Sequence, residues 1–257
     1  MKLLAFIFFS VSISGCMAQQ KPPQVMKGLE VITVLDIHDL DLNPYTIQRK
    51  FFIVEKDSIN IFTIPSLELF GKTKKDDFGD LVTELDSVQY HYYNVIFETG
   101  QKFGYTCDSL GRDWKKIPLD SFLASNSVYA LDTLVNSLGE NSSLVSSKIS
   151  GDGEVLNENF ATKIKPDFKT SDSTNTTYDR KLNHYRFSFS RRADQAKKRK
   201  LCRFEKVFNA DPAGEYMFLR EKRYYLFEMK EVDIPKPEIM DKLVSMYHDL
   251  EKNKPGR

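Results

Sequence analysis

His91 and Cys107 are the two residues whose types best suit nucleophilic catalysis. They lie in the segments 89–98 (QYHYYNVIFE) and 101–107 (QKFGYTC), on either side of the turn Thr99-Gly100. If the segments form a hairpin, the imidazole and the thiol could be cross-strand neighbours, as a general base and its nucleophile must be. A change of register by one residue would instead place them on opposite faces of the sheet. A structural role or a disulfide for Cys107 is the alternative that we favour.

Two acidic patterns have the residue types of metal ligands. Asp36 and His38 alternate along one predicted strand, but a zinc site needs further ligands, and no others lie nearby in the sequence. The run 39–43 (DLDLN) spaces its oxygen donors as the start of an EF-hand loop does. Its sixth position is Pro44 where that loop has Gly, and its twelfth is Lys50 where it has Glu. We therefore predict an acidic, solvent-exposed turn and no metal site.

The familiar motifs of enzymes and cofactor sites are missing from the sequence. There is no G-x-S-x-G, no H-E-x-x-H, no C-x-x-C, no phosphate-binding P-loop and no dinucleotide fingerprint. We predict no cofactor, and whether the protein is an enzyme stays undecided, with the balance toward a non-enzyme. A hydrolase of envelope polymers that uses carboxylates among the 36 acidic residues is the alternative.

The strongest local charge feature is the run 191–203 (RRADQAKKRKLCR). Its cations could contact an anionic surface such as lipid headgroup phosphates. We favour the alternative of a solvated turn or helix, because 37 Lys and Arg residues balance 36 Asp and Glu residues over the chain. The same balance gives no reason to expect a nucleic-acid partner. The candidate patch consists of Arg191, Arg192, Lys197, Lys198, Arg199, Lys200 and Arg203.

The beginning of the chain has the features of an export signal. A positively charged start (MK) precedes the apolar residues 3–13 (LLAFIFFSVSI), which are too few to span a bilayer, since that takes roughly 20 apolar residues. The apolar stretch ends in ISGC, residues 13–16. This ending resembles the lipobox of bacterial lipoprotein signal peptides, in which an aliphatic residue and two small residues precede a cysteine.

The resemblance to bacterial lipoproteins implies a membrane anchor at Cys16. It implies cleavage before Cys16, a diacylglycerol on its sulfur and an acyl group on its new amino terminus. One acyl chain holds a protein only marginally at a membrane, whereas two or more anchor it stably. Because Met17, and not Asp, follows the cysteine, the resemblance favours the outer membrane. An ordinary signal peptide cut after Ala18 is the alternative, and either version exports the protein.

The export signal divides the chain into regions. Residues 1–15 are the predicted signal peptide, and residues 16–28 are the lipidated cysteine with a polar, proline-containing tether. Residues 29–252 are predicted to form a single domain, with a possible sub-boundary in the polar segment 139–178, and residues 253–257 form a tail. The composition of 139–178, rich in Ser, Thr, Asn and Gly, predicts long loops with one short element near 155–164.

The hydrophobic pattern of the mature chain has mostly a period of two. It predicts an α+β fold dominated by antiparallel sheet, with hairpin turns at 56–58 and 99–100. Helical periodicity predicts a mid-chain helix over 127–138, from an N-cap at Ser127 to a stop at Gly139, and an amphipathic C-terminal helix over 237–252 that docks on the sheet. The predicted strands are 30–35, 47–55, 59–64, 89–98, 101–107, 183–190, 201–208 and 215–229.

The chain contains three cysteines, an odd number for an exported protein. If Cys16 carries lipid, Cys107 and Cys202 remain as an even pair. A disulfide between them would close a loop of about 95 residues and stabilise the fold by roughly 4 to 5 kcal/mol. The alternative is two buried free thiols.

These observations together predict an exported, lipid-anchored protein of the bacterial envelope. We expect a non-enzymatic binding, accessory or immunity-type role with a protein partner in the envelope. The envelope-polymer hydrolase is the other candidate function.

Overall fold

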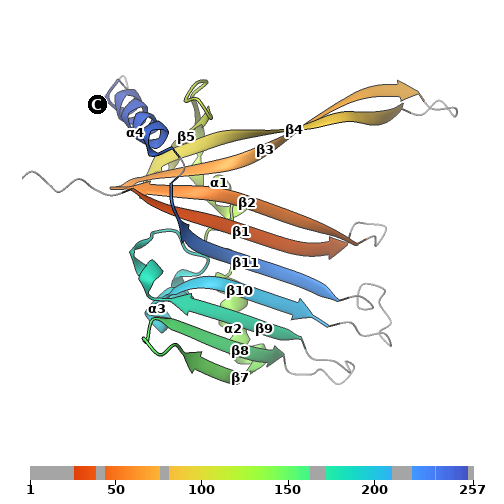
Figure 1. Cartoon of the computed structure of the whole chain (residues 1–257), viewed down its shortest axis with the longest axis vertical. Coiled ribbons are helices and arrows are strands. Elements are labelled where there is room, and N and C mark those ends of the chain that lie inside the picture. Colours follow the sequence, from red (N-terminus) through yellow and green to blue (C-terminus); the bar gives the residue numbers. More distant parts are fainter. Residues whose placement is uncertain are drawn as a thin grey trace, which may run out of the picture.

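Antiparallel strands form one broad sheet in the computed structural model of the chain (Figure 1). The structure describes residues 26–38, 44–75, 81–162, 172–209, 222–234 and 236–253. Within these residues the sheet has eleven strands in the order β6-β5-β4-β3-β2-β1-β11-β10-β9-β8-β7. The prediction of a mainly antiparallel sheet with a C-terminal helix is therefore confirmed.

The first half of the chain is a meander in which each strand pairs with the next one along the sequence. The predicted turns after Lys56 and after Glu98 are confirmed as the ends of hairpins. The strands are β1 (Lys27–His38), β2 (Pro44–Lys56), β3 (Ile59–Lys75), β4 (Leu81–Glu98), β5 (Phe103–Asp108) and β6 (Lys115–Pro118).

The second half begins with two helices and then forms a second meander. Its last strand returns to the centre of the sheet and pairs with β1, from Gly28 opposite Val232 to Leu35 opposite Tyr225. This pairing joins the two halves into one sheet. The elements are α1 (Leu119–Ser125), α2 (Asp132–Asn141), β7 (Ser142–Ile149), β8 (Val155–Thr162), β9 (Ser173–Asp179), η1 (Lys181–His184), α3 (Arg191–Lys197), β10 (Lys200–Phe208), β11 (Arg223–Val232) and α4 (Pro237–Lys252).

The short element predicted near 155–164 is confirmed as β8, but the prediction of long loops in the rest of 139–178 is wrong, because this polar segment also contributes β7 and β9 to the sheet. In β9 the buried positions alternate and are Thr174, Thr176 and Tyr178. Threonine is β-branched and favours strands, although its hydroxyl hides the pattern from a count of apolar residues. In β7, at the sheet edge, only Ser142 is buried, so no hydrophobic period marks that strand.

In the second half the predicted mid-chain helix is present with different bounds, and one expected strand does not form. The mid-chain helix begins at Asp132 and not at Ser127, which has a left-handed backbone (φ 63°), and Gly139 lies inside this helix instead of ending it. The expected strand 183–190 is the end of η1 followed by an irregular segment. Its aromatic residues alternate as in a strand, yet the N–H groups of Arg186 and Phe187 bond to a side-chain carboxylate and not to a neighbouring strand.

Apolar side chains are buried on both faces of the sheet. Neighbouring residues such as Ile53 and Val54 belong to different hydrophobic clusters, as expected when successive side chains of a strand point to opposite faces. The larger cluster includes residues of α1, α2, η1 and α3, whereas the smaller one lies under α4. Helix α4 begins with Pro237 and buries Leu243, Val244 and Tyr247 in that smaller cluster, which confirms that it docks on the sheet.

The helices of the described residues are all too short or too polar to cross a membrane.

The predicted disulfide between Cys107 and Cys202 is wrong for this fold. The two residues lie on β5 and β10, which are six strand spacings apart in the sheet, and both thiols are free. At about 4.8 Å per spacing their strands are roughly 29 Å apart, whereas bridged α-carbons lie within about 7 Å. The alternative of free thiols is the one that the structure shows, with Cys107 buried and Cys202 partly buried.

Both thiols should therefore resist modification in the folded protein. Burial raises the pKa of Cys107 and that of Cys202 to about 12, so almost no reactive thiolate exists at pH 7.5. We expect iodoacetamide to modify the Cys107 and Cys202 peptides slowly in native protein and fully after urea unfolding without reductant, as measured by peptide mass spectrometry. If modification in urea required a reductant, the two thiols would be bridged and the sheet order would be wrong.

Candidate functional site

The structure separates His91 and Cys107, the candidate catalytic pair that the sequence analysis did not favour. Cys107 lies opposite Asn94 on β4, and His91 lies three residues before Asn94 and opposite Ser66 of β3. Three residues are about 10 Å along a strand, and an odd number of steps turns the side chain to the other face. Because the Cys107 thiol is also buried, with its pKa raised to about 12, the two residues do not form a nucleophile and its base.

Of the candidate metal ligands, Asp36 is the one whose side chain the structure describes. The Asp36 carboxylate accepts a hydrogen bond from the Thr46 hydroxyl at 2.7 Å, an interaction between neighbouring strands. The run 39–43 and the side chain of His38 lie outside the described residues. Among the residues that are described, no group of three or more His, Cys, Asp or Glu side chains could hold a metal ion.

Much of the basic run 191–203 is bound within the fold. Lys197 contacts Glu158 (2.7 Å), Lys200 contacts Asp194 (3.1 Å) and Arg203 contacts Glu228 (2.8 Å). Arg199 donates to main-chain carbonyl oxygens, including that of Gly153 at 2.9 Å. Arg192 and Lys198 are exposed, and Arg191 points to a pocket described next. The run is therefore divided between structural cations and exposed ones.

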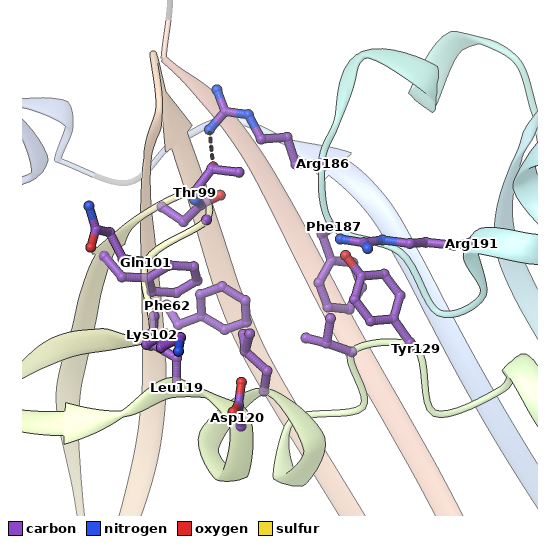
Figure 2. A pocket seen from close by; sticks show the side chains of 15 residues that line it. Phe62, Thr99, Gln101, Lys102, Leu119, Asp120, Tyr129, Arg186, Phe187 and Arg191 are labelled. Carbon is purple, nitrogen blue, oxygen red and sulfur yellow. Dashed lines mark hydrogen bonds between the residues drawn. The ribbon is translucent and has the colours of Figure 1, made fainter.

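A pocket of about 530 Å³ lies between the sheet and α1 (Figure 2). We call it the α1 pocket, and its volume is within the range of about 300–1,000 Å³ that small-molecule sites occupy. Residues from both halves of the chain line it. They are Asn60, Phe62, Phe97, Thr99, Gly100, Gln101, Lys102, Leu119, Asp120, Leu123, Val128, Tyr129, Arg186, Phe187 and Arg191.

Aromatic rings form the floor of the α1 pocket. The Phe62 ring packs against Phe97 at 5.6 Å, against Phe122 at 5.4 Å and against Phe187 at 6.3 Å between ring centroids. Phe62 and Phe97 come from β3 and β4, and Phe122 comes from α1. Leu119, Leu123 and Val128 complete an apolar surface that favours an apolar ligand or part of one.

One wall of the pocket is the irregular segment 185–190 between η1 and α3, which we call the crossing segment. The buried Glu55 carboxylate on β2 accepts hydrogen bonds from the backbone N–H of Arg186 (2.9 and 3.1 Å) and of Phe187 (3.1 Å). The buried Tyr185 hydroxyl, whose pKa is raised by burial, donates to the Gly28 carbonyl at 3.1 Å. These contacts hold the segment against β1 and β2 and place Phe187 in the pocket.

The connection between α1 and α2, residues 126–131, lines the pocket next to the crossing segment. Ser127 and Tyr129 have left-handed backbones (φ 63° and 57°), a conformation that costs an L-residue about 1–2 kcal/mol. The Tyr129 N–H donates to the Ser188 carbonyl at 3.0 Å, and the Arg191 guanidinium stacks 4.0 Å from the Tyr129 ring centre. The contacts with the crossing segment thus stabilise a strained connection that lines the pocket.

The rim of the pocket is positively charged. It carries Lys102, Arg186 and Arg191 against a single carboxylate, Asp120, so the lining has a net charge of three minus one, or +2. Arg186 donates to the Thr99 hydroxyl at 3.2 Å across the mouth (Figure 2). In the described part of the chain, none of the three cations pairs with a carboxylate, unlike Lys197, Lys200 and Arg203.

Only one residue of this site, Arg191, is a candidate binding residue from the sequence, as part of the basic run 191–203. The floor residues look like ordinary core residues in the sequence, and the pocket depends on contacts between segments far apart in the chain. Comparison with known proteins adds no assignment: no family model and no curated protein matches this sequence.

The Glu55 contacts should contribute measurably to stability. Glu55→Gln keeps the shape of the side chain but replaces one acceptor oxygen with a donor group, which would face the N–H groups of Arg186 and Phe187. Because hydrogen bonds to buried charged groups contribute about 1.5–3 kcal/mol, we expect the free energy of unfolding in urea to fall by roughly 1–3 kcal/mol.

Glu98→Gln is the control for the Glu55 substitution. Glu98 accepts a hydrogen bond from Ser58 at a partly buried turn, so its replacement should cost less than about 1 kcal/mol. Equal losses for the two variants would show that Glu55 has no special role.

Proposed function

We propose that the protein is an exported lipoprotein of the bacterial envelope whose α+β domain binds an apolar or partly apolar ligand in the α1 pocket. The observation that carries this proposal is the pocket itself, with an aromatic floor and a volume of about 530 Å³. Its occupant would be held by burial of apolar surface against Phe62, Phe97 and Phe187.

The composition of the lining supports binding more than hydrolysis. Among the fifteen lining residues, Asp120 is the one carboxylate, and there is no histidine or cysteine. Most glycoside hydrolases use two carboxyl groups that flank the bond to be cleaved, and nucleophilic catalysis needs a base beside the nucleophile. The lining of the α1 pocket supplies neither arrangement. A protein partner in the envelope and an outer-membrane location remain predictions from the sequence.

The membrane anchor at Cys16 is a part of the proposal that lies outside the described residues. Ten residues separate Cys16 from Lys27, where β1 begins. At about 3.3–3.6 Å per extended residue, they would keep the start of β1 within roughly 40 Å of the membrane surface. The domain would therefore work close to a bilayer.

Metabolic labelling with a palmitate analogue tests the anchor. We expect the wild-type protein made in a bacterial host to take up the label and the Cys16→Ser variant to lose it entirely. Cys202→Ser is the matched control and should keep the label, since Cys202 is in β10 and its contact with the Thr177 carbonyl can be made by a hydroxyl. A label that survives Cys16→Ser would overturn the anchored version of the proposal.

Extraction of the purified native protein with organic solvent tests the binding function. We expect mass spectrometry to find a co-purified small molecule with the wild type and several-fold less of it with Val128→Trp, because the indole fills the pocket. Leu110→Trp is the control, since Leu110 is 60% exposed and does not line the pocket. Circular dichroism should show that both variants fold. Equal recovery from the two variants, or no bound molecule in the wild type, would contradict the proposal.

A further inference from the structure

We infer that the α1 pocket takes a single-chain amphiphile with an anionic headgroup, of which a long-chain fatty acid is the simplest example. This inference rests on the proposed binding function and specifies its ligand class. The acyl chain lies on the floor formed by Phe62, Phe97 and Phe187, and the headgroup lies at the rim near Arg186 and Arg191.

The size of the pocket favours one chain over two. One water molecule occupies about 30 Å³ in the liquid, so the pocket volume of about 530 Å³ holds roughly eighteen atomic groups of that size. That number corresponds to one long acyl chain with a small headgroup. A phospholipid with two chains is about twice as large and would leave one chain exposed to water.

The charges of the rim favour an anion. The fold pairs Lys197, Lys200 and Arg203 with carboxylates, whereas Arg186 and Arg191 have the neutral partners Thr99 and Tyr129. Guanidinium groups bind carboxylates and phosphates through paired, charge-assisted hydrogen bonds. Lys102, Arg186 and Arg191 therefore give the rim three exposed cationic side chains that would attract a carboxylate or phosphate to the edge of the apolar surface.

The rim lies at the end of the sheet that is nearest the proposed membrane anchor, and the membrane would be the source of such a ligand. Lys27, the first residue of β1, lies opposite Glu55 at the end of β2, and Ile59 lies opposite Glu98, next to the turn at Thr99. The start of β1 and the rim residues 99–102 are therefore at the same end of the sheet, the end at which the β1 ribbon begins in Figure 1. A lipid anchor at Cys16 would hold this end toward the membrane, where single-chain amphiphiles are found.

Photocrosslinking in lipid nanodiscs tests the inference with the full-length, lipidated protein. The discs contain phosphatidylcholine and one of two probes of equal chain length, a diazirine-bearing palmitic acid or the corresponding alcohol. Peptide mass spectrometry then quantifies crosslinks to residues 119–129. We expect the acid to crosslink about fivefold more than the alcohol, because only the acid pairs with the guanidinium groups.

Charge variants and competitors complete the test. Arg186→Gln with Arg191→Gln should remove the preference for the acid, whereas Arg192→Gln should keep it, since Arg192 is the exposed neighbour of Arg191 and does not line the pocket. Excess unlabelled palmitate or lysophosphatidate should compete, and the stronger competitor identifies the headgroup as a carboxylate or a phosphate.

The possible failures are distinguishable. If the acid and the alcohol crosslink equally to the pocket in the wild type, the inference about charge is wrong and the proposed binding function stands. If neither probe crosslinks to the pocket, the amphiphile inference fails. An empty wild-type protein in the solvent extraction would then overturn the binding function as well.

Discussion

The α1 pocket depends on one buried carboxylate. Glu55 is 5% exposed, and its two oxygens accept three contacts from the backbone N–H groups of Arg186 and Phe187. Burying a charged carboxylate is costly unless hydrogen bonds compensate for the lost water. The crossing segment supplies those bonds through its backbone N–H groups. Glu55 on β2, in the first half of the chain, therefore holds this segment of the second half against the sheet.

Several features of the site follow from this contact. With the segment fixed, Phe187 joins the ring cluster on the floor and Arg186 reaches Thr99 at the rim. The carbonyl of Ser188 becomes available to the Tyr129 N–H, and Arg191 at the start of α3 stacks on the Tyr129 ring. The apolar floor, the cationic rim and the strained connection between α1 and α2 thus all depend on the binding of the crossing segment to Glu55. This contact joins the two halves of the chain, as the pairing of β1 with β11 also does.

The sequence was informative where structure is local and apolar. The hairpin turns at 56–58 and 99–100 and the C-terminal helix follow from hydrophobic period and turn residues, and all three are confirmed. It misled where the buried positions are polar, as with Thr174 and Thr176 in β9, because hydroxyl side chains do not register as a hydrophobic face. It misled again at 183–190, where aromatic alternation reflects packing against α1 and the sheet without strand pairing.

The site itself could not be predicted from the sequence, for a physical reason. Its floor and rim come from β3, the turn between β4 and β5, α1, the connection from α1 to α2, and the crossing segment. These segments meet because Glu55 and Arg186, 131 positions apart, bond to each other. The predicted disulfide between Cys107 and Cys202 is wrong because it too depends on contacts between distant segments. The distance between their strands follows from the sheet order, which depends on the return of β11 to β1.

Carbon-13 NMR of palmitate labelled at its carboxyl carbon, bound to the full-length protein in nanodiscs, tests most directly whether the cationic rim of the α1 pocket holds an anionic headgroup. Its shift reports ionisation, and nearby guanidinium groups lower the pKa of a carboxylic acid because they favour the charged form. We expect a separate bound resonance that stays ionised to lower pH than palmitate in protein-free discs, and that loses this difference with Arg186→Gln and Arg191→Gln. A bound resonance that titrates together with palmitate in protein-free discs would show that the guanidinium groups do not hold the headgroup.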